Sequence, residues 1–170
     1  MKSRHFTYLN PLSSHILKTP AHVQSDILPV LIVGAGPAGL FCALSLAQNG
    51  VKVRILDKAD RFYVGSRGYG VQANGACLSR DYLEGILRGH LAKYGVKVEL
   101  GQGLVAIEQR DDLVKAGISP FQAGQATGDT KIIEAQYLVG ADGARGASRE
   151  LLGLTFQGKL TMQTVWFGTM

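Results

Sequence analysis

Cysteine is scarce in this sequence, and long apolar runs are absent. Its 170 residues include only two cysteines, Cys42 and Cys77, which are too few for a metal-binding set or a disulfide framework. No stretch is apolar over the roughly 18 residues that a transmembrane helix needs, and no segment has the apolar core of a secretory signal peptide. These absences favour a reducing compartment, and we expect a cytoplasmic protein.

Acidic residues are absent from the first 25 positions, where the charged side chains are Lys2, Arg4 and Lys18. We expect residues 1–27 to form a disordered N-terminal extension, with mitochondrial targeting as the alternative. The remaining 15 basic side chains are nearly balanced by 13 acidic ones and are dispersed along the chain. Because a nucleic-acid interface needs clustered cations, we expect no nucleic-acid partner.

With 46% apolar and 18% charged residues, the chain has a globular composition. Its most informative segment is the apolar run Val30–Val33, which leads directly into a glycine-rich turn. Such a sequence predicts a buried strand, a phosphate-binding loop and a helix start, with glycine where the backbone turns tightly or approaches a pyrophosphate. The first N–H groups of the helix would favour phosphate. The candidate cofactor-binding residues here are Gly34, Gly36, Pro37, Ala38 and Gly39.

An acidic residue follows at the spacing expected of a ribose-binding side chain. Residues 40–47 predict a helix that ends before Gly50, and residues 51–56 predict a second strand. This strand ends at Asp57, which lies 23 residues after Gly34. A carboxylate at about this spacing accepts a ribose hydroxyl in dinucleotide-binding folds. The alternative is an ordinary β-α-β unit with a glycine turn and a surface aspartate.

The middle of the chain predicts a loop, a helix and a third strand. Residues 65–75 are rich in glycine and predict a loop with little regular structure. Residues 80–94 predict an amphipathic helix, with Glu84 and Arg88 paired on its exposed side. Its apolar stripe consists of Leu83, Ile86, Leu87, Leu91 and Tyr94. Residues 96–100 alternate in polarity and predict a third parallel strand.

The last third of the sequence predicts an antiparallel ribbon and a second strand that ends directly in a glycine-containing turn. We call each such strand end, with its turn, a strand exit. In order, the expected elements are ribbon strands at 104–108 and 113–116, a loop at 117–130, a short strand at 132–133, a strand from Tyr137, a helix at 147–152 and a strand at 162–167. The strand from Tyr137 breaks into a turn at Asp142-Gly143, which places a carboxylate at the ligand-binding edge of the sheet. Asp-Gly is also a common turn dipeptide, so a plain turn is the alternative.

Three segments in this order resemble the FAD-dependent aromatic monooxygenases, the family that includes phenol hydroxylase and para-hydroxybenzoate hydroxylase. The first is the glycine turn with Asp57. The second is residues 65–72, similar to the family's loop in which an arginine contacts the FAD pyrophosphate; Arg67 is the matching position. A guanidinium there can reach a phosphate, and a solvated loop arginine is the alternative. The third is residues 137–149, similar to the family's Asp-Gly motif for FAD and NAD(P)H, with Asp142-Gly143 as the pair.

The resemblance covers most of residues 28–170 and implies a fold, a cofactor and a reaction. The implied fold class is α/β, a Rossmann-like FAD-binding fold with a parallel sheet, a crossing antiparallel ribbon and flanking helices. The implied activity is a monooxygenase in which NAD(P)H reduces FAD and one oxygen atom of O2 enters a small aromatic, phenolic substrate. The cofactor performs this chemistry. We name no catalytic residue, because the expected substrate pocket is absent from the resembling part, and no metal ligand.

The sequence also departs from the family pattern. The family carries a longer segment between its arginine loop and the next helix, and it often has Gln and Arg where this chain has Arg80 and Tyr82. The family's later Gly-Asp motif and most of its substrate pocket lie beyond the resembling part. We therefore expect residues 28–160 to form a shortened FAD-binding domain, residues 161–170 to begin a substrate domain, and this chain to be inactive alone.

Two other functions fit the glycine turn. One is a nucleotide-binding module without catalysis, and the other is an NAD(P)-dependent dehydrogenase, against which the Arg67 loop and the Asp142-Gly143 segment argue. A shortened domain would expose apolar surface around Val165, Trp166 and Phe167. The sequence does not distinguish a monomer from a homodimer.

Overall fold

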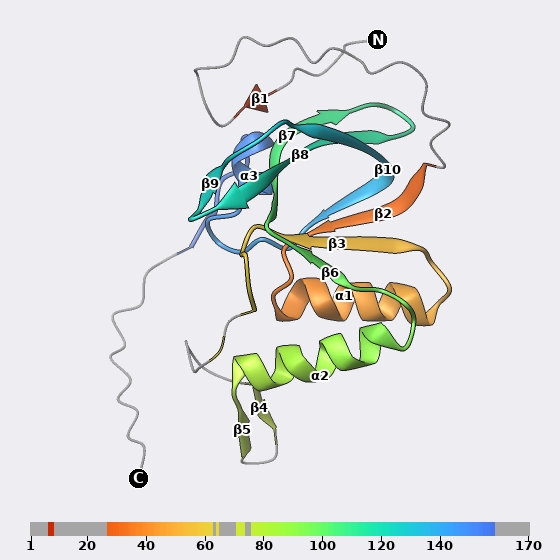
Figure 1. Cartoon of the computed structure of the whole chain (residues 1–170), viewed down its shortest axis with the longest axis vertical. Helices are drawn as coiled ribbons and strands as arrows, with labels where there is room; N and C mark the ends of the chain where they lie inside the picture. The colour runs from red at the N-terminus through yellow and green to blue at the C-terminus, as the bar shows by residue number, and fades with distance from the viewer. Residues whose placement is uncertain (1–6, 9–26, 63, 65–70, 74–75, 159–170) are drawn as a thin grey trace.

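The computed structural model describes residues 7–8, 27–62, 64, 71–73 and 76–158 (Figure 1). The helices of this part are α1 (Pro37–Gln48), α2 (Arg80–Ala92) and α3 (Ala147–Leu151). Its strands are β1 (Thr7–Tyr8), β2 (Leu28–Val33), β3 (Val53–Asp57), β4 (Val71–Ala73), β5 (Ala76–Leu78), β6 (Val98–Leu100), β7 (Gln102–Gln109), β8 (Val114–Gln122), β9 (Gln125–Ala126) and β10 (Lys131–Gly140). The expected strand at 162–167 and the apolar surface predicted there lie outside the described residues.

One mixed sheet organises the described part, in the strand order β1-β7-β8-β10-β2-β3-β6. Strands β10, β2, β3 and β6 pair in parallel, and β7, β8 and β10 pair antiparallel as the predicted ribbon. β10 belongs to both regions, because residues 131–135 pair with β8 and residues 135–140 pair with β2. The prediction of two strands here is therefore wrong. No turn separates Ile133 from Tyr137, and both lie on one continuous strand.

The sheet separates two apolar cores, so the fold has three layers (Figure 1). On one face, α1 and α2 pack against Val30 and Ile32 of β2. On the other face, the ribbon and α3 pack against Leu31 and Val33 of the same strand. Because successive side chains of a strand point to opposite faces, β2 needs the uninterrupted apolar run that the sequence shows. The predicted α/β class, with its parallel sheet, crossing ribbon and flanking helices, is confirmed.

Two segments predicted as loops contain strands. β8 extends through residues 117–122, and β4 and β5 form a hairpin that begins within residues 65–75. Gly117 pairs with Ala106 of β7 and with Ile132 of β10. A Cβ at Gly117 would lie only 2.9 Å from the Cβ of Ala106. Gly117 is paired on both edges of its strand and lies close to Ala106, which explains why a glycine stands inside this strand. From local sequence alone, a glycine here is typical of a turn.

The predicted amphipathic face of α2 is only partly correct. Leu87 and Leu91 are buried in the core beside α1. Ile86 and Tyr94, expected on the same stripe, are 40% and 49% exposed. Glu84, predicted on the exposed side, is buried at 5% exposure. The helical period identifies one apolar stripe, but the width and centre of the buried face depend on how α1 lies against α2.

A short strand from the N-terminal segment pairs with the outer edge of the ribbon. Thr7 and Tyr8 of β1 lie opposite Ile107 and Ala106 of β7 in antiparallel register. These two residues fall within residues 1–27, for which the sequence predicts a disordered extension. The strand satisfies backbone groups along an edge that would otherwise be open at this point.

The carboxyl-terminal half of β10 has one open side. Residues 137–140 pair with β2 on one edge, and no described strand pairs with them on the other. Tyr137 on this half-strand is 68% exposed. A cavity of about 570 Å³ lies here, and its lining includes Gln136, Tyr137, Leu138 and Leu152. An unpaired strand edge beside apolar side chains is a surface to which further polypeptide can be added.

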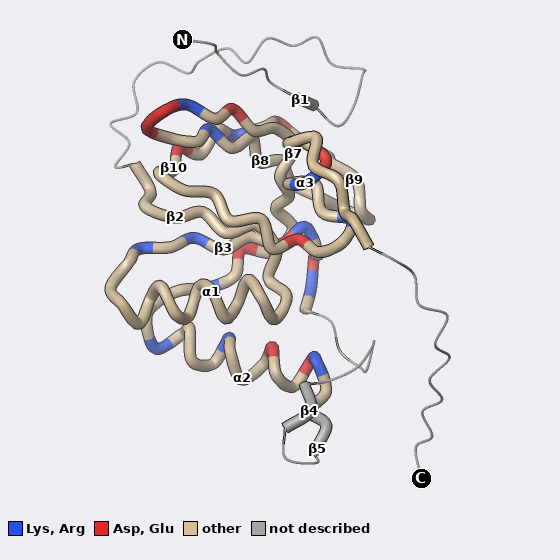
Figure 2. Tube along the Cα trace, turned by 180° about the vertical axis from the view of Figure 1, so that it is seen from behind, with Lys and Arg blue, Asp and Glu red and all other residues tan. Residues whose placement is uncertain are grey.

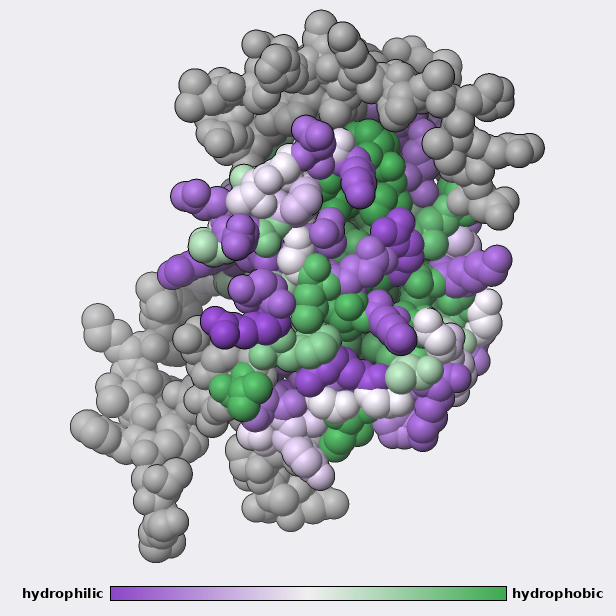
Figure 3. Space-filling view, viewed as in Figure 1, coloured by the Kyte–Doolittle hydropathy of each residue, from purple (hydrophilic) through white to green (hydrophobic). Residues whose placement is uncertain are grey.

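Charged residues of both signs are interspersed along the described chain (Figure 2). Arg54 of β3 pairs with Glu99 of β6 at 2.8 Å, and Lys115 of β8 pairs with Glu134 of β10 at 2.6 Å. The hydrogen bonds to Glu99 raise the pKa of the Arg54 guanidinium above its ordinary value, against the lowering effect of burial. On the face shown in Figure 3, apolar residues reach the surface in separate places among polar ones. No helix of the described part is long and apolar enough to cross a membrane.

Truncating either face of β2 should destabilise the fold. Leu31 and Ile32 are both 0% exposed but point into different cores. We expect Leu31→Ala and Ile32→Ala each to lower the free energy of unfolding by about 2–5 kcal/mol, because each leaves a cavity. Urea denaturation followed by circular dichroism measures both losses. Phe41→Ala, at a 64% exposed position of α1, is the control and should change stability by about 0.5 kcal/mol or less. A loss confined to one of the two core variants would contradict the three-layer arrangement.

Candidate functional site

The turn between β2 and α1 depends on glycine at particular positions. Gly34 has a φ of +101°, in the left-handed region, and its N–H donates to the Leu56 carbonyl at 2.8 Å. A Cβ at Gly39 would overlap the carbonyl oxygen of Gly34. Gly36 is the N-cap of α1, and Pro37 is its first helical residue. The turn therefore lies against the helix, and the first amides of α1 have no acceptor within the helix.

A second strand exit lies directly beside the first. Gly140, the last residue of β10, lies opposite Val33 of β2, and the Ala141 N–H donates to the Val33 carbonyl at 2.7 Å. Gly143 has a φ of +85°, so this chain also turns through the left-handed region. A Cβ at Gly34 would overlap the Ala141 carbonyl. The two strand exits, predicted separately from the sequence, form one structural unit.

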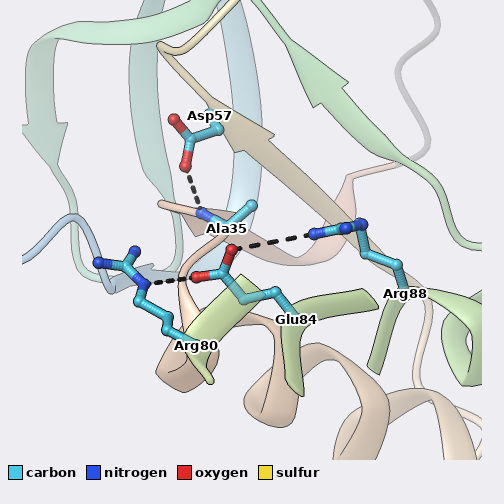
Figure 4. A network of polar contacts seen from close by, with 5 residues as sticks. All are labelled: Ala35, Asp57, Arg80, Glu84 and Arg88. Carbon is cyan, nitrogen blue, oxygen red and sulfur yellow. Dashed lines mark hydrogen bonds and ion pairs between the residues drawn. The ribbon is translucent and has the colours of Figure 1, made fainter. Parts of the chain in front are cut away.

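Asp57 lies at the end of β3 and holds the glycine turn (Figure 4). Its Oδ2 accepts a hydrogen bond from the Ala35 N–H at 2.7 Å, and its Oδ1 accepts one from the Ala59 N–H at 2.9 Å. A carboxylate has about four acceptor sites, so both oxygens can still accept from a ligand hydroxyl. Asp57, predicted from its spacing, therefore lies at the glycine turn. Its hydrogen bonds also hold the backbone of the turn, which the spacing does not indicate.

Asp142 caps the start of α3. Its Oδ2 accepts hydrogen bonds from the Ser148 N–H at 2.9 Å and from the Ser148 hydroxyl at 3.1 Å. A Cβ at Gly146, the N-cap of α3, would overlap the Asp142 carboxylate. A negative charge at a helix N-terminus is stabilising. Asp142 therefore orders the second turn, while no donor among the described residues occupies its Oδ1.

The two arginines after the Asp-Gly motif have different positions. Arg149 donates from Nη1 to the Ala144 carbonyl at 2.5 Å and from Nη2 to the Gly143 carbonyl at 3.0 Å. Its guanidinium also lies 4.8 Å from the centroid of the Phe156 ring. Arg145 instead lines the cavity described next. Arg149 therefore stabilises the turn by bonding its carbonyl groups, and Arg145 lies at the cavity beside the turn.

A cavity of about 400 Å³ lies where β2, β3 and β10 end. The candidate residues that line it are Gly34, Gly36, Asp57, Asp142 and Gly143. Pro37, Ala38 and Gly39 form the adjoining first turn of α1 without being part of the described lining. Arg67 lies outside the described residues. The structure thus brings both strand exits and the end of β3 together in one pocket.

Three basic side chains also line the cavity, namely Lys58, Arg80 and Arg145. The resemblance places Arg145 where the family usually has an arginine, and neither Lys58 nor Arg80 was named as a site residue from the sequence. Arg80, at the start of α2, donates from Nε to Glu84 Oε1 at 2.7 Å (Figure 4). The predicted pair of Glu84 with Arg88 is longer, at 3.9 Å, so the main partner of Glu84 is Arg80. The same four-residue spacing could have identified this pair, but Glu before Arg is the usually preferred order.

The side chains around the cavity include guanidinium, ammonium and carboxylate groups. The described lining contains no Ser, Cys or His that could act as a nucleophile or as a histidine base. Nor do the described residues bring together three or more His, Cys, Asp or Glu side chains able to hold a metal ion. Backbone amides, guanidinium groups and carboxylates are the groups that recognise phosphates and hydroxyls.

A sequence profile of the FAD binding domain family matches residues 27–75 and 74–170. The chain belongs to this family. The two matched segments overlap at residues 74–75, between β4 and β5. The match includes both strand exits and the end of β3, which together form the cavity.

Relatives of the chain are named as flavin-dependent monooxygenases and hydroxylases. It is 28% identical over 188 aligned residues to a flavin-dependent monooxygenase of Mycobacteroides abscessus, covering 78% of this chain and 38% of that protein. It is 32% identical over 184 aligned residues to the 3-(3-hydroxy-phenyl)propionate/3-hydroxycinnamic acid hydroxylase of Mycolicibacterium gilvum, covering 84% of this chain and 32% of that one. The crystal structure of AlpK matches with a TM-score of 0.66 and 28% identity, over 76% of this chain and 34% of AlpK. The chain spans about a third of the length of these relatives.

Replacing Gly34 should test the contact between the strand exits. Gly34→Ala introduces a Cβ at positive φ and against the Ala141 carbonyl. Gly50→Ala is the matched control, because Gly50 also has positive φ, +73°, but a Cβ there would meet no atom within 4 Å. We expect Gly34→Ala to lower the free energy of unfolding by about 1–3 kcal/mol more than Gly50→Ala does. Equal losses in thermal denaturation would show that the contact does not constrain the fold.

Removing the Asp142 carboxylate should loosen the second turn. Asp142→Ala leaves the Ser148 N–H without its acceptor and removes a negative charge from the start of α3. We expect a loss of about 1–2 kcal/mol in the free energy of unfolding, the usual range for a helix cap. Asp112→Ala, in the exposed turn between β7 and β8, should have an effect of about 0.5 kcal/mol or less. If both variants unfold at the same urea concentration, the capping role of Asp142 is refuted.

Proposed function

We propose that this chain binds FAD and forms the cofactor-binding part of an NAD(P)H-dependent monooxygenase that hydroxylates a small aromatic, phenolic substrate. The observation that carries the proposal is the contact between the two strand exits. Because of this contact, a glycine turn, a helix N-terminus and Asp57 lie around one cavity. Membership of the FAD binding domain family supports the cofactor. The relatives named as monooxygenases and as a hydroxylase of a hydroxyphenyl acid support the reaction class.

The glycine turn fits the pyrophosphate of a dinucleotide. Gly34 and Gly36 present backbone without side chains to the cavity, so a phosphate can approach closely. Pro37 has no N–H to lose at the first helical position, and the amides of Ala38 and Gly39 lie in the first turn of α1. These amides and the positive end of the helix dipole would donate to the phosphate oxygens.

The other candidate residues would bind the two ends of FAD. Asp57 would accept a hydroxyl of the adenosine ribose. Asp142-Gly143 would contact the flavin side through the turn backbone and the Asp142 Oδ1, which accepts from no described residue. Arg67, outside the described residues, would contribute a guanidinium to the pyrophosphate. When bound, FAD supplies the redox and oxygen chemistry, while the protein binds it, orients it and excludes water. We assign no catalytic side chain and no metal to this chain.

We infer that residues 28–160 are the cofactor domain of a larger functional unit, and that residues 161–170 begin its substrate domain. The open edge of residues 137–140 and the exposed Tyr137 beside it support additional polypeptide at this place. The relatives are about three times as long as the region that matches this chain, and this length also supports additional polypeptide. On this basis the chain alone should bind FAD without hydroxylating an aromatic compound.

FAD binding to the purified chain tests the function directly. Isothermal titration and the absorbance of the flavin bands should report binding, and ADP should compete. Asp57→Asn removes the negative charge of the ribose acceptor, and we expect it to weaken both FAD and ADP by about tenfold or more, as for a hydrogen bond to a charged group. Asp112→Asn makes the same chemical change in the exposed β7–β8 turn and should leave both affinities unchanged.

The outcomes separate the three functions that the sequence leaves open. A change in the flavin bands supports the monooxygenase assignment. Binding of ADP with no flavin binding would favour a nucleotide-binding module without catalysis. Specific binding of NAD(P) with hydride transfer would favour a dehydrogenase. A folded chain that binds neither FAD nor ADP contradicts the proposal.

A further inference from the structure

The cavity at the strand exits has a single aromatic side chain in its described lining, that of Phe121. Phe121 is half-buried near the end of β8. The residues assigned above to the cofactor would bind its phosphate oxygens, its ribose and its flavin side, so none of them accounts for the base at the other end of the dinucleotide. Aromatic side chains are the usual stacking surfaces for nucleobases.

The Phe121 ring occupies the space that a side chain at position 103 would fill. A Cβ at Gly103 of β7 would overlap the Cδ2, Cε2 and Cζ atoms of the ring. Gly103 is not among the described glycines with positive φ, so the backbone conformation does not require glycine here. Both residues line the cavity. The glycine therefore accommodates an aromatic ring at the cavity wall.

A series of hydrogen bonds links the backbone of Phe121 to Asp57. The Phe121 N–H donates to the Gly101 carbonyl at 2.8 Å, and the Gly101 N–H donates to the Ala59 carbonyl at 2.8 Å. The Ala59 N–H in turn donates to Asp57 Oδ1 at 2.9 Å. The other oxygen, Oδ2, accepts from Ala35 in the glycine turn. Asp57 is thus bonded to the glycine turn through one oxygen and, by way of two residues, to Phe121 through the other.

The order of groups in a dinucleotide matches this order of residues. The ribose carries the phosphate at one end and the base at the other. With the phosphate at the glycine turn and a ribose hydroxyl at Asp57, the base extends away from the glycine turn, toward Phe121. Phe121 pairs with Ala126 of β9, so its backbone is already fixed. A phenyl ring also has few rotatable bonds, and its ordering on binding has a small entropic cost.

We propose that Phe121 forms the stacking surface for the adenine base of the dinucleotide, and that Gly103 leaves the space in which its ring lies. The inference rests on the proposed function and adds two residues to those assigned there. Leu104 also lines the cavity, but it is 2% exposed and belongs to the core beneath the ribbon, so it has little surface to offer a ligand.

The test titrates the whole chain with ADP and with inorganic pyrophosphate, which has neither ribose nor base. Phe121→Leu should weaken ADP by about tenfold, because the stacking surface is lost, and should leave pyrophosphate binding unchanged. Phe121→Tyr retains the ring and should bind ADP within about twofold of the unchanged chain. Phe41→Leu is the control, since Phe41 is 64% exposed on α1 and is not in the described lining. Equal losses of ADP and pyrophosphate in Phe121→Leu would show that the ring only supports the cavity, and would overturn the assignment.

The proton resonances of the base of bound ADP give a second readout. The ring current of a stacked phenyl group moves these resonances upfield. We expect this upfield shift in the unchanged chain and in Phe121→Tyr, and we expect its loss in Phe121→Leu. A role of Phe121 in the fold alone would not produce the shift. Identical resonances in all three complexes would contradict the stacking.

A double-variant cycle tests the role of Gly103. Gly103→Ala places a methyl group where the ring lies, so the ring must move, and ADP binding should weaken by about threefold to tenfold. In the Phe121→Ala background the methyl group has room, and Gly103→Ala should have no further effect. An equal loss in both backgrounds would show that the methyl group itself obstructs the ligand, and would overturn the role of Gly103.

The inference and the function that it rests on can fail separately. If the unchanged chain binds ADP and FAD, and Phe121→Leu binds both with the same affinity, Phe121 is not a base contact and the proposed function stands. If Phe121→Leu weakens FAD but not ADP, the ring contacts the flavin and the adenine assignment is overturned. If the unchanged, folded chain binds neither ligand, both the inference and the function are overturned.

Discussion

The backbone contact between the turn after β2 and the turn after β10 is the constraint on which the site depends. The Ala141 N–H donates to the Val33 carbonyl, and Gly34 has no room for a side chain because the Ala141 carbonyl lies against it. This contact requires β2 and β10 to be parallel neighbours that end at the same level. It therefore brings the glycine turn and Asp142 to one edge of the sheet, where the carboxyl ends of parallel strands form a ligand-binding crevice.

β10 makes this contact possible because it joins two kinds of sheet. Its first half completes the antiparallel ribbon and its second half pairs with β2, with Ala135 paired on both sides. The ribbon is thereby held over one face of β2, where Leu31 and Val33 are buried beneath it. The helices cover the opposite face of the same strand. Burial on both faces fixes the register of β2, since a shift of one residue would exchange the two sets of side chains.

Local sequence predicts the parts of this arrangement that depend on local chemistry. The glycine turn, the strand ending at Asp57 and the turn at Asp142-Gly143 each follow from residue type and spacing, and the structure has all three. The burial of Glu84 and the strand through Gly117 do not follow from such rules, because α1 and the two neighbours of β8 determine them. Arg80 was compared with the family pattern but not named as a site residue, because its place in the cavity depends on how α2 lies against α1.

The residues that form the cavity also hold its walls in place, so binding and stability are linked at most positions. Asp57 bonds the Ala35 amide within the glycine turn, and Asp142 bonds the start of α3. A change at either residue alters the backbone geometry as well as the contacts open to a ligand. Phe121 differs, because its side chain has no polar atom and so forms no hydrogen bond with either turn. An affinity change at Phe121 can therefore be assigned to contact with the ligand, whereas one at Asp57 or Asp142 must first be separated from a loss of order in the turn.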